Sequence, residues 1–86
     1  MKMIRYDIPN FIVRNEMSDY VASHPAMSRD EAITEWMVTK YKAWIETHIN
    51  PVVDFVANIE PTYFDATFAD VADANTFLST MGGREY

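Results

Sequence analysis

Asp54 and Asp65 are the residues of this 86-residue chain whose type and spacing could do chemistry. They flank the Glu60-Pro61 turn, and a hairpin around that turn would place both side chains on the outer face of a sheet. A carboxylate pair can perform general acid–base catalysis, it can form an acidic contact patch, or it can simply be solvated. We predict an acidic contact patch as the candidate partner-binding site, and it consists of Asp54, Glu60, Tyr63 and Asp65.

No other residues form a recognisable catalytic or metal-binding pattern. His24 and His48 lie far apart in the sequence, whereas a zinc ion needs three or four ligands from His, Cys or carboxylate. The chain has no cysteine, which excludes thiolate zinc sites and disulfides. Its serines lack the Gly-x-Ser-x-Gly nucleophile motif, and Gly82-Gly83 is too short to cradle a phosphate. The sequence therefore predicts no catalytic residue, no metal and no cofactor, and we expect a protein that is not an enzyme.

Acidic residues dominate the second half of the chain. The whole sequence has 13 acidic and 7 basic side chains, so its formal net charge is −6. After residue 49 a single base, Arg84, accompanies six acids, which are Asp54, Glu60, Asp65, Asp70, Asp73 and Glu85. We therefore expect the hairpin and the last helix to carry a field of one sign. Such a field favours a basic protein surface, and it disfavours nucleic-acid phosphates and anionic lipid.

The composition is that of one small α+β domain spanning residues 1–86. Apolar residues make up 49% of the chain and aromatic residues 14%, which suffices for a core without disulfides. No apolar run approaches the roughly 18 residues that suggest a membrane span. Residues 1–7 lack the apolar stretch of a secretion signal, and the absence of cysteine fits a reducing compartment. We expect a cytoplasmic protein without membrane association.

Capping residues and apolar periodicity predict two helices in the first half. A short helix spans about 15–23, with Asn15 as its cap, while the four residues before it are ambiguous. The longest helix spans 29–49. Ser28 is its cap, Glu31 completes a capping box, and apolar residues recur along one face.

Alternation of apolar and polar residues predicts three strands, at 3–8, 52–59 and 62–69. Asn50 and Pro51 could instead open a helix over the second of these segments, although its β-branched and aromatic residues favour the strand. The expected inward residues are Ile4, Tyr6 and Ile8 in the first strand, Val53, Phe55, Ala57 and Ile59 in the second, and Phe64, Ala66 and Phe68 in the third.

A third helix is predicted over 71–81, with Asp70 as its cap and Gly82-Gly83 as its end. The element order is then β-α-α-β-β-α. We expect a small, mostly antiparallel sheet that is covered by the long amphipathic helix and the C-terminal helix.

The C-terminal quarter resembles the ending of small uncharacterised tailed-bacteriophage proteins. The shared pattern is a strand, an Ala-Asp-Ala-x-x-Phe helix and a terminal glycine, and here it consists of Ala72, Asp73, Ala74, Phe77 and Gly82. A preceding amphipathic helix that bears Trp36 and Trp44 is similar as well. This resemblance is mainly a folding pattern, so it implies a phage origin and transfers no functional residue.

Many characterised phage proteins of this size bind and inhibit a host macromolecule, such as a defence nuclease, a CRISPR effector or RNA polymerase. We therefore expect a small acidic phage-type protein that inhibits or redirects a host protein or nucleoprotein complex with a basic surface, in the host cytoplasm. The alternatives are a structural or accessory homo-oligomeric subunit, such as a homodimer, and a DNA mimic.

Overall fold

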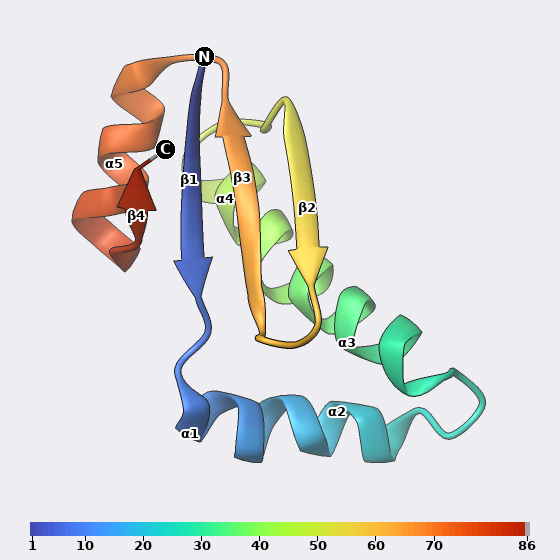
Figure 1. Ribbon diagram of the computed structural model, residues 1–86. Helices are drawn as coiled ribbons and strands as arrows, with labels where there is room; N and C mark the ends of the chain where they lie inside the picture. Colours follow the sequence, from blue (N-terminus) through green and yellow to red (C-terminus); the bar gives the residue numbers. More distant parts are fainter. Residues whose placement is uncertain (86) are drawn as a thin grey trace.

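A four-stranded antiparallel sheet forms the centre of the fold (Figure 1). The structure is a computed structural model that describes residues 1–85. Its strands are β1 (Lys2–Asp7), β2 (Asp54–Asn58), β3 (Tyr63–Phe68) and β4 (Arg84–Glu85). Their order across the sheet is β2-β3-β1-β4, so the N-terminal strand lies between the hairpin and the C-terminal strand.

Helices connect the strands. The second and third helices pack against the sheet, and the first runs along its lower end in Figure 1 and packs against the second. The first helix consists of α1 (Asn10–Ile12), the π-helical segment η1 (Val13–Met17) and α2 (Ser18–Ser23). The second consists of α3 (Arg29–Met37), the π-helical segment η2 (Val38–Lys42) and α4 (Ala43–His48), and the third is α5 (Val71–Met81). The predicted α+β class and element order are confirmed, with β4 as an additional strand.

The core lies between the helices and the inner face of β3. Phe64, Ala66 and Phe68 alternate along this strand and are fully or almost fully buried. The Phe64 ring stacks on Phe55 of β2, with centroids 4.7 Å apart, and it contacts Phe77 of α5 at 6.1 Å. Such aromatic contacts add to the large apolar area that each ring buries. The period-two pattern of the sequence thus identifies the buried face correctly.

Predicted helix caps are present at the starts of α3 and α5. The Ser28 hydroxyl accepts a hydrogen bond from the backbone N–H of Glu31, and the Asp70 carboxylate accepts one from Ala72. At the end of α5, Gly83 has a φ of +115°, and a Cβ there would lie 2.9 Å from the carbonyl oxygen of Arg5. The second glycine therefore permits the close approach that lets β4 pair with β1.

The first helix begins five residues earlier than the predicted cap, Asn15, indicated. It starts at Asn10, because the Pro9 carbonyl accepts hydrogen bonds from the N–H groups of Ile12 and Val13. Pro9 itself precedes the helix as its cap: its φ of −58° and ψ of 140° are extended, and its carbonyl accepts the first hydrogen bonds of the helix. Asn15 lies exposed within η1.

Residues 54–58 form a strand, which resolves the choice between strand and helix in this region. Val53 was expected on the core face, but it is 56% exposed. It precedes β2 at the edge of the sheet, where no strand of residues 1–85 lies on the outer side of β2. The alternating pattern is therefore right for the strand itself and wrong at its first predicted inward residue.

Tyr41 is a polar residue in the centre of the core. It is 2% exposed, and its hydroxyl has no hydrogen-bond partner among residues 1–85. Burial raises the pKa of Tyr41 well above its usual range, and the neighbouring Tyr6 and Glu16 raise it further. A buried hydroxyl without a partner costs about 1–3 kcal/mol of stability.

Replacing this hydroxyl should stabilise the fold. We expect Tyr41→Phe to raise the free energy of unfolding by about 1 kcal/mol in urea denaturation at neutral pH, because the ring stays and the unpaired oxygen is removed. Tyr20→Phe, at a partly exposed position, should change stability by less than about 0.5 kcal/mol. A Tyr41→Phe protein that is less stable than the wild type would contradict this interpretation.

Alkaline pH provides a second measurement on the same residue. The folded-state pKa of Tyr41 lies above its unfolded value, which is about 10, so the folded state holds the phenol proton more tightly. The corresponding stability is complete below about pH 10 and is lost as the pH rises further. Urea denaturation from about pH 9 to 11 should show a steeper loss of stability in the wild type than in Tyr41→Phe.

Candidate functional site

Three of the four predicted binding residues lie at outer-face positions of the sheet. The register places Asp65 opposite Arg5 on one side and Val56 on the other, and Tyr63 lies opposite Asn58. Asp54 lies opposite Thr67, and this places Asp54 diagonally across from Asp65 on the same face. Figure 1 shows the helices behind and beside the sheet, with none crossing in front of it. This face is therefore open to a partner.

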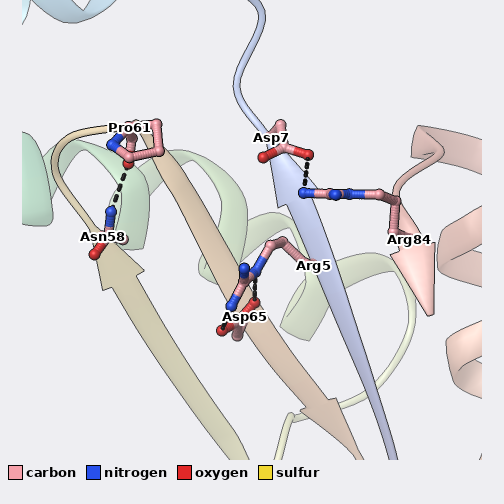
Figure 2. Close-up of polar contacts among 6 residues, drawn as sticks. All are labelled: Arg5, Asp7, Asn58, Pro61, Asp65 and Arg84. Carbon is pink, nitrogen blue, oxygen red and sulfur yellow. Dashed lines mark hydrogen bonds and ion pairs between the residues drawn. The ribbon is translucent and has the colours of Figure 1, made fainter. Parts of the chain in front are cut away.

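Arg5 is the residue at this face that the sequence reasoning missed. Its guanidinium donates two hydrogen bonds to the Asp65 carboxylate, at 2.7 and 2.9 Å (Figure 2). It also lies over the Tyr63 ring, 4.0 Å from the centroid. The Arg5 and Asp65 side chains are only 25% and 15% exposed. Asp65 is therefore neutralised by a paired base, and Tyr63, Arg5 and Asp65 together form a structured centre for the face.

A second ion pair extends along the same face. Arg84 of β4 lies opposite Arg5 in the register, and its guanidinium is 2.8 Å from the Asp7 carboxylate (Figure 2). Both of these side chains are more than half exposed. The expectation of a single-sign field on the hairpin is thus wrong. It followed from chain order, whereas the sheet order brings β1, with its base, next to β3.

Asp54 and Glu60 lie toward opposite ends of the hairpin. The four residue steps along β2 separate its ends by roughly 14 Å, and Glu60 lies beyond, in the turn. The Asp54 carboxylate accepts a hydrogen bond from the N–H of Phe55. In the turn, the Asn58 amide donates to the Pro61 carbonyl at 2.6 Å (Figure 2). Both acids are exposed, so they form the rim of the outer face and not a carboxylate pair.

A groove beside β2 carries a further group of acids. It has a volume of about 470 Å³ and is lined by residues of α3, of the loop before it and of the hairpin turn after β2, which are Met27, Asp30, Glu31, Thr34, Glu35 and Ile59. The sequence explains Asp30 and Glu31 by their place at the start of a capped helix, and both lie in the first turn of α3. Only the fold shows that Ile59 gives this acidic groove an apolar wall.

A second hollow, of about 340 Å³, lies between the first two helices. Glu16 of η1 and Lys40 of η2 both line it, and their side chains form an ion pair. Tyr20 and Trp36 add aromatic surface. Because the cation and one carboxylate already satisfy each other, this hollow has less charge to offer a partner than the outer face or the groove.

The two histidines have matching structural roles at helix ends. Nδ1 of His24 hydrogen-bonds to the Tyr20 carbonyl, and the imidazole stacks on the Tyr20 ring at 4.1 Å. His48 has the same relation to Trp44, with a ring separation of 4.9 Å. Within residues 1–85, no three or more His, Cys, Asp or Glu side chains form a cluster suited to a metal ion. None of the helices in that range combines the length and apolar character that crossing a bilayer requires.

Comparisons with known proteins add no assignment. The sequence matches no protein-family model, and neither the curated proteins nor the solved structures provide a match.

The Arg5–Asp65 pair should contribute measurably to stability. We expect Arg5→Met and Asp65→Asn each to lower the free energy of unfolding by about 1–2 kcal/mol, because each breaks a partly buried, doubly hydrogen-bonded ion pair. In a double-mutant cycle measured by urea denaturation, the two losses should not add.

The Arg29–Asp30 pair provides the matched control. Its side chains are 62% and 75% exposed and 3.8 Å apart, so solvent screens their attraction. Arg29→Met should change stability by less than about 0.5 kcal/mol. Equal effects for Arg5→Met and Arg29→Met would show that the geometry of the outer-face pair contributes nothing.

Proposed function

We propose that this protein is a small acidic phage-type binding protein that inhibits or redirects a host protein or nucleoprotein complex without catalysis. The observation that supports the proposal best is the sheet face that the helices leave open. That face has a structured centre and two exposed carboxylates at its ends. The resemblance of the C-terminal strand and helix to phage proteins motivates the host setting, in which the protein would act in the host cytoplasm against anti-phage defence or in host takeover.

The open face has the organisation of a protein-binding surface. Tyr63 and the guanidinium of Arg5 lie in contact at its centre, and Val56 beside them is 52% exposed. Tyr and Arg are enriched among residues that dominate binding energy, and interfaces place such residues inside a polar rim. Asp54 and Glu60 supply the charge of that rim. A partner with a basic surface around an apolar centre would complement this arrangement.

The distribution of charge argues against a DNA mimic. A mimic needs a row of unpaired carboxylates at the spacing of phosphates. On the outer face of the described sheet, Asp65 is paired with Arg5 and Asp7 with Arg84. Cations therefore interrupt the acids, and a phosphate-binding surface would meet repulsion as well as attraction.

A structural or accessory homo-oligomeric subunit is the second candidate function. It is favoured by a different observation, the edge of β2, which is open within residues 1–85 and bears two exposed valines, Val53 and Val56. The two functions differ in what occupies the molecule's surface, which is a foreign basic protein in one and a second copy in the other.

Neutralising the rim should weaken partner binding through the association rate. A tagged wild-type protein should capture a host partner from lysate, identified by mass spectrometry. With that purified partner, Asp54→Asn/Glu60→Gln should associate at least about tenfold more slowly at low salt and lose most of the salt dependence, because rim charges act mainly on the on-rate. Asp65 is kept, since its removal would take away the carboxylate that Arg5 binds.

Asp19→Asn/Glu46→Gln is the matched control, because it changes the net charge equally at exposed positions on the helices. Its association rate should stay close to that of the wild type apart from the general effect of net charge. Equal slowing by both double variants would refute the rim as the binding site. Failure to capture any host protein, by a protein that sediments as a homo-oligomer, would favour the structural alternative.

A further inference from the structure

The edge of β2 has few of the features that keep sheet edges from pairing. Strand β2 reads Asp-Phe-Val-Ala-Asn, so its three central residues are uncharged, and it contains no lysine and no proline. Its ladder to β3 involves all five residues in register. Natural edge strands avoid pairing with other chains by inward charges, lysine, proline or bulges. Because an antiparallel ladder uses only alternate backbone groups on each side, β2 presents the N–H and C=O groups of Phe55 and Ala57 along its outer edge. The Phe55 N–H donates to the Asp54 carboxylate in the single chain, so pairing must exchange that hydrogen bond for one to the second copy.

The opposite edge of the sheet is treated differently. Strand β4 has only two residues, and both are charged. Lys2 pairs with Glu85, and Asp7 pairs with Arg84, so charges line the border between β1 and β4. A short, charged edge strand opposes further pairing. Of the two sheet edges described in residues 1–85, the one at β2 is therefore suited to association.

We propose that β2 pairs with β2 of a second copy of this chain, in antiparallel register about a two-fold axis at Val56, which joins the two sheets into one. The sequence of β2 is complementary to itself in this register. In a two-fold symmetric interface, a residue i of one copy that lies opposite residue j of the other also has its own counterpart opposite the residue j of the first copy. Centred on Val56, the register places Asp54 opposite Asn58 of the second copy, and Phe55 opposite Ala57.

Each of these pairs is complementary. Val56 is 52% exposed in the single chain and meets its own symmetry mate, which covers both side chains. On pairing, the Asp54 carboxylate exchanges the N–H of Phe55 for the Asn58 amide of the second copy, so no acid faces an acid at the strand edge. Phe55 and Ala57 are only partly buried, and the pairing extends their inner face across the two-fold axis. Cross-strand pairs of this kind are the unit that stabilises a sheet.

The same register accounts for the exposure of Val53. Beyond the strand ends, this register brings Val53, which precedes β2 in one copy, near Ile59, which follows β2 in the other. Ile59 and Met27 form an apolar part of the groove beside β2, which has a volume of about 470 Å³. Val53 is 56% exposed and follows the uncharged residues Pro51 and Val52. The two-fold axis thus brings an exposed apolar segment to a groove with an apolar wall, and it does so twice. The acids of the groove then face no acid of this segment.

The dimer is the assembly that the second candidate function requires, and it is tested without any host partner. Sedimentation velocity of the purified wild-type chain over a range of concentrations should show a reversible monomer–dimer equilibrium. A five-residue edge is a small interface, so we expect a dissociation constant in the micromolar range. A wild-type protein that stays monomeric at its highest soluble concentration would overturn the proposal.

Val56→Lys should weaken the dimer at least about tenfold, because it places two ammonium groups face to face. Val71→Lys is the matched control, since Val71 is 53% exposed but lies on α5, and it should dimerise like the wild type. Equal dimerisation of both variants would overturn the assignment of the interface to β2. Circular dichroism checks that each variant is folded.

Cysteine cross-linking reports the register and does not depend on the lysine variant folding. The natural chain has no cysteine, so a single introduced thiol gives an unambiguous readout. Directly opposed residues of antiparallel strands have Cα atoms about 4.5–5.5 Å apart, within the range that a disulfide spans. Val56→Cys should form a covalent dimer under mild oxidation much faster than Val71→Cys. Equal cross-linking rates would overturn the two-fold register.

Discussion

Burial of one face of β3 is the constraint on which the rest of the structure depends. The strand contributes Phe64, Ala66 and Phe68 to the core, and successive side chains of a strand point to opposite faces. The helices that cover the sheet must then lie on that one side. In a chain of 86 residues there is no further layer among the described elements to cover the other side. The open outer face and the open edge are therefore direct consequences of how this small core is built.

Local features of the fold could be predicted because they depend on residues close in sequence. The caps at Ser28 and Asp70 need only the following turn of helix, and the inward alternation of β3 needs only the strand itself. Other features depend on distant residues. Strand β4 can form because Gly83 approaches the backbone of Arg5 closely. No residue near position 84 in the sequence indicates that contact. Asn15 failed as a cap because Pro9, six positions earlier, already caps the helix.

The candidate site shows the same division. The side chains of Asp65 and Tyr63 could be assigned to the outer face from alternation alone. Their electrostatic state could not, because Arg5 lies 60 positions away in the chain from Asp65 and meets it only through the sheet order. A count of charges along the sequence measures the net field of a segment. Short-range pairing depends on neighbours in space, and at ion-pair distances a single guanidinium outweighs several distant carboxylates.

The open face and the open edge are linked through symmetry. When identical edge strands pair antiparallel, the two-fold axis is perpendicular to the sheet, so both outer faces lie on the same side of the joined sheet. Each copy would then present its Tyr63–Arg5–Asp65 centre next to that of its mate, and Asp54 would lie near the junction. A partner that contacts both copies gains from the high effective concentration of the second site. Dimerisation would therefore widen the binding face without covering its centre, so a host-binding protein and a paired subunit are compatible uses of one fold.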